Sequence, residues 1–106
     1  MKRRPVVYLP SAQRDLLEAR DYIRKDSPAS ADAWLARIDA ALARLGEFPK
    51  SGSVPKDPRL ARLGYRVVVI GEHLAFYVVR PAAVEARRVV HGRRRYSFLF
   101  GPAAAR

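Results

Sequence analysis

The sequence contains no cysteine, only two histidines and no long apolar run. A chain without cysteine can form neither a disulfide framework nor a thiolate metal site, and His73 and His91 are too few for a conventional zinc centre. We therefore expect no metal and no other cofactor. No apolar stretch approaches the roughly 20 residues that cross a bilayer, and the basic start at Lys2 is soon interrupted by Pro5, unlike a signal peptide. We expect a cytoplasmic protein that makes no contact with a membrane.

The chain has 106 residues, of which 49% are hydrophobic and 29% are charged. This length supports one compact domain with one core, because domains usually contain roughly 100–150 residues. The apolar fraction is ordinary for a folded protein and too high for a disordered chain. We expect a single domain over residues 1–100, followed by a flexible tail at residues 101–106.

Positive charge is concentrated in the second half of the chain, within a net charge of +11. Residues 1–50 contain 10 basic and 7 acidic residues, whereas residues 51–106 contain 11 and 3. Seventeen of the 21 basic residues are arginine, whose planar guanidinium suits two-pronged contacts with carboxylate or phosphate. The composition therefore predicts an anionic partner, either nucleic acid or an acidic protein.

A short strand and a helix are predicted at the start of the chain. The run from Val6 to Leu9 is β-branched or aromatic at three of its four positions, which favours a strand. Ser11 is expected to cap a helix that runs to about Lys25, because apolar residues then recur at helical spacing. Asp15 falls on the polar side of this helix and is expected to face solvent.

A second helix follows after a short link, so the two helices are expected to form an antiparallel hairpin. Ser27 is the predicted N-cap, and apolar residues recur every three or four positions up to Leu45. Gly46 follows Leu45 and is expected to form a left-handed cap at the C-terminus of this helix. Residues 46–58 are rich in proline, glycine and serine and predict an extended loop that carries contacts.

The remaining chain has the pattern of β-strands. Residues 65–70, apart from Arg66, and residues 74–79 are apolar and β-rich, and a turn with His73 at the surface separates them. Residues 84–90 form a third predicted strand. The fold class is therefore predicted as α+β in the order β-α-α-β-β-β, with a helical hairpin packed on a mainly antiparallel four-stranded sheet. The hairpin covers one sheet face and leaves the other for a partner or the C-terminal tail.

Several short motifs occur in the order and spacing of a known family. They are Ala12-x-x-Asp15-Leu16, Pro49-x-x-Gly52, Gly64-Tyr65-Arg66, Phe76-Tyr77 and Arg88-Val89-Val90-His91-Gly92-Arg93-Arg94. On these residues the chain resembles toxins of the RelE/ParE superfamily of bacterial type II toxin–antitoxin systems, and the ParE-like branch fits better than the RelE-like branch. The resemblance implies the same helical hairpin on a four-stranded sheet.

The resemblance also implies a growth-inhibiting toxin that binds an essential target and is neutralised by a cognate antitoxin. ParE-like members are described as inhibitors of DNA gyrase, which is the expected target. We expect the antitoxin to be acidic and encoded beside the toxin, with apolar side chains that cover the open sheet face or a groove beside Trp34. The residues expected to bind partners are Trp34, Arg66, Tyr77, Arg88, Arg93 and Arg94.

An alternative hypothesis follows from the RelE-like branch, whose members cut messenger RNA on the ribosome. Such an endoribonuclease needs an acid, a base and cations around the phosphate, and the candidates are His91, Tyr96, Arg66 and Arg94. We favour a toxin without catalysis because these residues do not form a convincing acid–base set. Arg95 departs from the common ParE-like ending, in which aspartate often follows the arginine pair, so the subtype stays open. A third hypothesis is a non-toxic basic domain that only binds an antitoxin.

Overall fold

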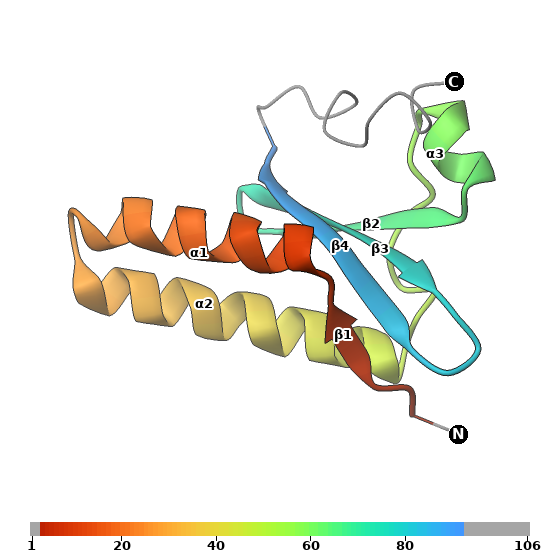
Figure 1. Ribbon diagram of the computed structural model, residues 1–106, viewed down its shortest axis with the longest axis horizontal. Helices are drawn as coiled ribbons and strands as arrows, with labels where there is room; N and C mark the ends of the chain where they lie inside the picture. Colours follow the sequence, from red (N-terminus) through yellow and green to blue (C-terminus); the bar gives the residue numbers. More distant parts are fainter. Residues whose placement is uncertain (1–2, 93–106) are drawn as a thin grey trace.

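The computed structural model describes residues 3–92, and Figure 1 shows its arrangement. The elements are β1 (Val6–Tyr8), α1 (Pro10–Arg24), α2 (Pro28–Ala43), a 3-10 turn η1 (Arg44–Gly46), α3 (Pro58–Arg62), β2 (Tyr65–Ile70), β3 (His73–Val79) and β4 (Val84–His91). The predicted order of strands and helices is confirmed, with the short α3 added before β2. Within residues 3–92 no helix is both long enough and apolar enough to span a bilayer. The expected tail at residues 101–106 lies outside the described residues.

The four strands form one sheet in the order β1-β4-β3-β2. The pairs β2–β3 and β3–β4 are antiparallel, which confirms the predicted meander, whereas β1 runs parallel to β4. The sheet is therefore mixed but mainly antiparallel. The two long helices lie side by side and extend past the sheet (Figure 1), so part of the hairpin overhangs the end of β4.

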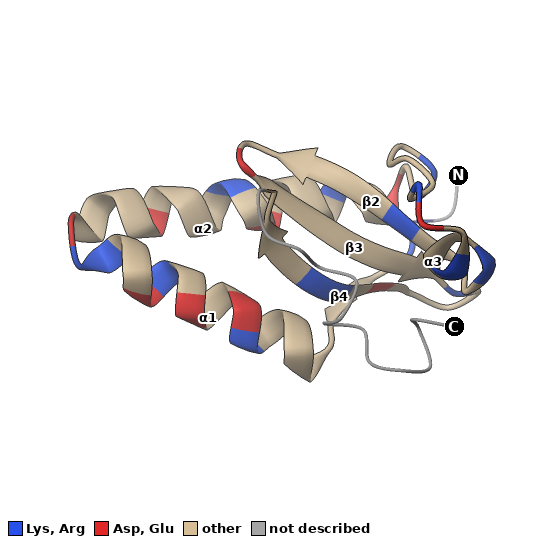
Figure 2. Ribbon diagram, turned by 90° about the horizontal axis from the view of Figure 1, so that it is seen from above, with Lys and Arg blue, Asp and Glu red and all other residues tan. Residues whose placement is uncertain are grey.

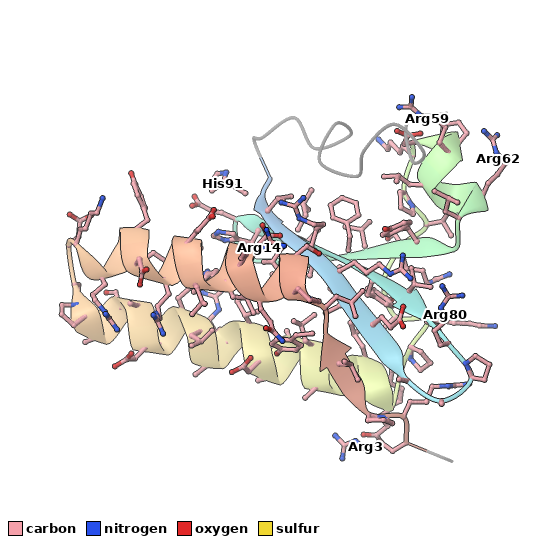
Figure 3. The ribbon with its side chains drawn as sticks, viewed as in Figure 1. Arg3, Arg14, Arg59, Arg62, Arg80 and His91 are labelled. Carbon is pink, nitrogen blue, oxygen red and sulfur yellow. The ribbon has the colours of Figure 1, made fainter. Side chains whose placement is uncertain are left out.

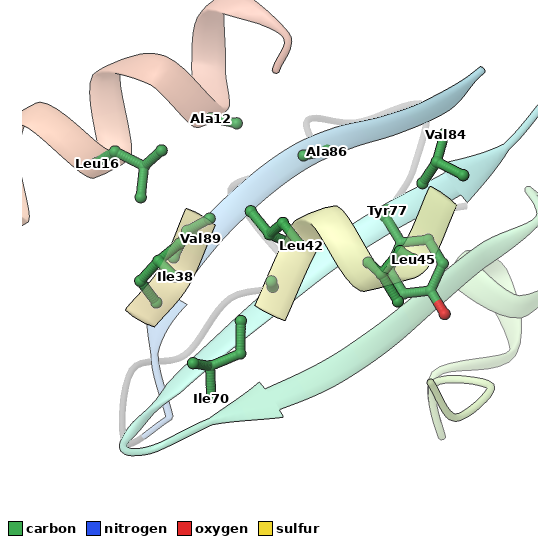
Figure 4. Packing of buried hydrophobic residues seen from close by; sticks show 11 residues of the cluster. Ala12, Leu16, Ile38, Leu42, Leu45, Ile70, Tyr77, Val84, Ala86 and Val89 are labelled. Atoms are coloured by element: carbon green, nitrogen blue, oxygen red, sulfur yellow. The ribbon is translucent and has the colours of Figure 1, made fainter. Parts of the chain in front are cut away.

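The main core lies between the helical hairpin and the sheet. Leu16 of α1 and Ile38 and Leu42 of α2 pack against strand residues that include Tyr77 and Val89, as Figure 4 shows. A smaller cluster lies on the other sheet face, where Leu60 of α3 packs with four buried strand side chains, which are Tyr65, Phe76, Val78 and Val90. The second face is thus partly covered by α3, which the sequence patterns did not predict.

Two of the predicted helix caps are wrong, and both errors have a tertiary cause. α1 begins at Pro10 after Leu9, while the hydroxyl of Ser11 donates a hydrogen bond of 2.7 Å to the carbonyl of Arg87 in β4. Gly46 does not adopt a left-handed conformation, because in residues 3–92 only Gly64 and Gly71 have positive φ. The confirmed cap is Ser27, whose hydroxyl accepts from the backbone N–H of Ser30 at 3.2 Å.

Gly46 is required for a different reason, which is the close approach of the N-terminal segment. A Cβ at this position would collide with the carbonyl oxygen of Arg4, and the Arg4 N–H donates to the Gly46 carbonyl at 2.9 Å. A residue without a side chain lets two backbones meet here. The contact fixes the segment that leads into β1.

Candidate functional site

The sequence-predicted site residues are distributed over both ends of the sheet. His91, at the end of β4, pairs with His73, which pairs in turn with Ile70 of β2. Arg66 lies four residues before Ile70 along β2, which corresponds to about 13 Å at roughly 3.3 Å per residue. Of the other candidates, Arg93, Arg94 and Tyr96 lie outside the described residues.

Arg66 holds the loop that precedes α3. Its guanidinium Nη2 donates to the carbonyl oxygens of Lys50 at 3.1 Å and Gly52 at 2.7 Å. Ser53 adds a backbone bridge to β2, because its N–H and C=O both bond to Val67 at 2.8 Å. The predicted contact-carrying loop is thus tied along the outer edge of β2.

Tyr77, which was expected to bind a partner, is completely buried within residues 3–92. Its hydroxyl donates to the carbonyl of Pro49 at 2.7 Å and accepts from the N–H of Gly52 at 3.0 Å. A Cβ at Gly52 would overlap this hydroxyl, which explains the glycine. Tyr77 therefore anchors the loop from inside the core, and the motif residues Pro49 and Gly52 are its binding site.

Arg88 forms a two-pronged ion pair with Asp15 of α1. The Nε and Nη2 atoms of Arg88 lie 2.7 and 2.8 Å from the two carboxylate oxygens, and the Val89 N–H donates to the same carboxylate at 2.9 Å. The hydrogen bond that Arg88 donates to Asp15 raises the pKa of Arg88 above its ordinary value. The Asp15 side chain is only 8% exposed, so its predicted position on the solvent side of the helix is wrong. The guanidinium of Arg88 is therefore held by Asp15 within the fold, and little of it is available to a partner.

Trp34 lies in a groove between the overhanging helices and the end of the sheet. The groove has a volume of about 740 Å³ and is lined by α1, α2, the β2–β3 turn and the end of β4. Trp34 Nε1 donates to His73 Nδ1 at 3.4 Å, and the His73 and His91 rings are 5.4 Å apart. The Glu72 carboxylate lies 3.6 Å from His91 Nε2. The sequence predicted the groove at Trp34 but treated His73 as a surface residue.

His73 is half-buried, and this position changes its protonation. Burial lowers the pKa of His73 below its ordinary 6.5, the neighbouring His91 lowers it further, and Glu72 opposes both effects. A neutral His73 keeps Nδ1 as an acceptor for the Trp34 N–H. The groove therefore has a defined tautomer at its centre at neutral pH.

Charge is divided between the two ends of the molecule. Residues 10–43, which form the helical hairpin, contain five basic and six acidic residues, whereas residues 3–9 and 44–92 together contain eleven basic and four acidic residues. Figure 2 shows acidic positions along the helices and basic positions around α3. In Figure 3, Arg59, Arg62 and Arg80 lie on the side of the molecule away from His91. The excess of positive charge thus lies outside the helical hairpin.

Comparisons with known proteins agree with this architecture. Residues 6–96 match the family model described as ParE toxin of the type II toxin–antitoxin system, parDE. A Caulobacter vibrioides protein named Toxin RelE2 is 33% identical over 90 residues, which cover 84% of this chain and 96% of the relative. The solved structure titled "Chromosomal ParDE TA system from P. aeruginosa" has a TM-score of 0.70 at 17% identity and covers 86% of this chain and 98% of that chain. At this identity the structural match concerns the fold alone.

Proposed function

Because the chain belongs to the ParE toxin family of type II toxin–antitoxin systems, we propose that it stops growth by binding an essential protein target, DNA gyrase, without cutting RNA. A toxin of this kind has a cognate antitoxin as its partner. We further propose that this antitoxin is acidic and encoded beside the toxin, in keeping with the net charge of +11.

The observation that carries the proposal is the separation of Arg66 and His91, the two catalytic candidates that lie within residues 3–92. An RNA-cleaving site needs its acid, base and phosphate-binding cations within hydrogen-bond reach of one phosphate. Arg66 and His91 are at opposite ends of the sheet, and Arg66 is occupied by loop carbonyls. His91 instead lies beside His73 and Glu72 in the groove.

The groove beside Trp34 is the surface that we assign to the target. Trp34 and Tyr22 line it, and aromatic side chains of this kind dominate the binding energy of many protein interfaces. Tyr22 is 72% exposed, although most aromatic side chains of small domains are covered. An exposed aromatic beside a groove of about 740 Å³ offers a protein partner an anchor point.

The test is to express the toxin alone under tight control and to assay the purified protein on two candidate targets. We expect inhibition of gyrase supercoiling, filamentous cells and an induced DNA-damage response, with messenger RNA intact in a translating extract. Cleaved messenger RNA with unaffected gyrase would establish the RelE-like alternative. Normal growth of cells that contain folded protein would leave only the non-toxic binding domain.

A further inference from the structure

A strip of basic and apolar side chains follows the outer edge of β2. We call it the basic strip and define it by three exposed cations and three exposed apolar residues of residues 48–63, which are Lys50, Lys56 and Arg62 with Phe48, Val54 and Leu63. The segment from residue 47 to residue 66 contains five basic and two acidic residues. None of these features is used by the groove beside Trp34.

The loop that carries most of the strip is fixed to the sheet. The backbone of Ser53 pairs with Val67, and Arg66 holds the carbonyls of Lys50 and Gly52. α3 then follows directly, capped by the Asp57 carboxylate, which accepts from the Arg59 N–H at 2.9 Å. The loop, α3 and the outer edge of β2 therefore form one preorganised surface.

The cations of the strip are not neutralised within the described chain. Asp57 forms an ion pair with Arg59 at 2.9 Å. Lys50, Lys56 and Arg62 form no ion pair with any residue of the described part, residues 3–92. Three exposed cations without an internal partner attract carboxylates from outside.

The apolar residues of the strip indicate whether its anionic partner is a nucleic acid or an acidic polypeptide. Phe48, Val54 and Leu63 are 47%, 56% and 51% exposed and lie among the cations along the chain. A nucleic-acid backbone binds cations but offers little that would cover aliphatic side chains. An acidic polypeptide with apolar side chains satisfies both features, so the strip fits a protein segment better than a nucleic acid.

The edge of β2 beyond Ser53 provides main-chain partners as well. Because Val67 bonds outward to Ser53, the alternation of an antiparallel pair directs the N–H and C=O of Val69 outward too. Within the described residues no backbone group pairs with them, and the Val69 side chain is 69% exposed. An extended segment laid along the strip could continue the ladder that Ser53 begins.

We infer that the basic strip is the docking surface for an acidic, apolar and extended segment of the antitoxin. This assignment rests on the proposed function and replaces our sequence-based expectation that the antitoxin covers the open sheet face or the groove beside Trp34. That groove is lined by three acidic residues, Asp15, Glu18 and Glu72, and by one basic residue, Arg37, so its excess of carboxylates would repel an acidic segment. The basic strip then binds the antitoxin, and the groove binds the target.

The experiment compares two triple variants of the full chain. One carries Lys50→Glu, Lys56→Glu and Arg62→Glu in the strip. Its control carries Arg14→Glu and Arg24→Glu on α1 and Lys25→Glu at the C-cap of α1, with the same change in net charge. Binding is measured with the full-length acidic protein encoded beside the toxin, at two salt concentrations. We expect the strip variant to bind about 100-fold more weakly, with a flattened salt dependence, and the control within about 3-fold of wild type.

Circular dichroism establishes that both variants are folded, and the single variants Lys56→Glu and Arg62→Glu replace the triple variant if it is not. Equal weakening by the strip variant and the control would show a net-charge effect and overturn the assignment. Wild-type affinity of the strip variant would overturn it as well. Loss of growth inhibition with normal antitoxin binding would assign the strip to the target instead. Because affinity is measured independently of toxicity, an inactive toxin would refute the proposed function without affecting this test.

Discussion

The Asp15 carboxylate of α1 binds the guanidinium of Arg88 in β4 through two contacts of 2.7 and 2.8 Å. Strand β1 covers β4 only as far as Ala86, whose carbonyl accepts from the Leu9 N–H at 2.9 Å. Beyond Ala86, side chains of α1 instead form hydrogen bonds with the backbone of β4. Ser11 donates to the Arg87 carbonyl, and Asp15 accepts from the Val89 N–H. One helical turn separates Ser11 from Asp15, so one face of α1 completes the open edge of the strand.

Replacing Asp15 should therefore destabilise the whole fold. Asp15→Asn leaves Arg88, whose side chain is 17% exposed, without its counter-ion, and breaking a mostly buried pair costs about 3 kcal/mol. The matched control is Asp21→Asn, because the Arg20–Asp21 pair is at the surface and should change stability by less than about 0.5 kcal/mol. Urea denaturation measures both values. A loss below about 1 kcal/mol for Asp15→Asn would show that the pair is not needed to close the edge.

Tyr77→Phe should loosen the loop from inside the core. The substitution removes the hydroxyl that bonds to Pro49 and Gly52, leaving a buried donor and acceptor unpaired at a cost of about 1–3 kcal/mol. Limited proteolysis should detect faster cleavage within residues 47–57. Tyr22→Phe is the control, since its ring is 72% exposed. Equal protease resistance of wild type and Tyr77→Phe would contradict the anchoring role.

Stability should fall as the pH decreases through the range in which His73 titrates. The pKa of His73 is lowered in the folded state from 6.5, so the unfolded chain takes up its proton first and unfolding is favoured below about pH 6.5. The slope for one proton is at most about 1.4 kcal/mol per pH unit and ends once the folded state is protonated as well. Two neighbouring residues act on the protonation of His73: His91 opposes it and Glu72 favours it.

Trp34 provides the measurement, because it is the single tryptophan and its N–H bonds to His73. Protonation of His73 converts Nδ1 from acceptor to donor, which breaks this bond and should quench the fluorescence of Trp34. The transition should have its midpoint below pH 6.5 in wild type and be absent in His73→Gln. His91→Gln should raise the midpoint by removing a like charge. A titration unchanged in His73→Gln would assign the signal to another group.

Local signals account for the part of the fold that the sequence predicted. The helical periodicity and the Ser27 cap of α2, and the β-rich runs of the meander, depend on neighbours within a few residues. Ser11, Asp15 and Gly46 were misplaced because their partners are remote in the chain. Ser11 bonds 76 residues away, Asp15 73 residues away, and Gly46 meets the N-terminal segment. Single-sequence patterns contain no information on such pairs.

The residues of the candidate site also divide into those that local patterns predicted and those that depend on remote partners. Trp34 was expected beside a groove, and the structure places it in the lining of one. His73 was missed because a histidine in a turn carries no signal of burial, and only the pairing of His73 with His91 across β3 and β4 brings both rings to Trp34. The long loop with Pro49 and Gly52 was a usable clue to Tyr77, since such a loop needs an internal anchor.

His91→Ala should reduce growth inhibition far less than the loss of a catalytic residue would, although His91 lines the groove assigned to the target. Its side chain is 41% exposed and lies beside Glu72, remote from Arg66 along the sheet, so its removal costs neither a core contact nor, under the proposed function, a proton transfer. The expected change in the inducer concentration that stops growth is less than about 3-fold, with folding verified by circular dichroism. Tyr96→Phe should behave in the same way. A loss of growth inhibition of about 100-fold or more in either folded variant has the magnitude of general acid–base catalysis. It would support the endoribonuclease, because a toxin that acts by binding a protein requires no proton transfer.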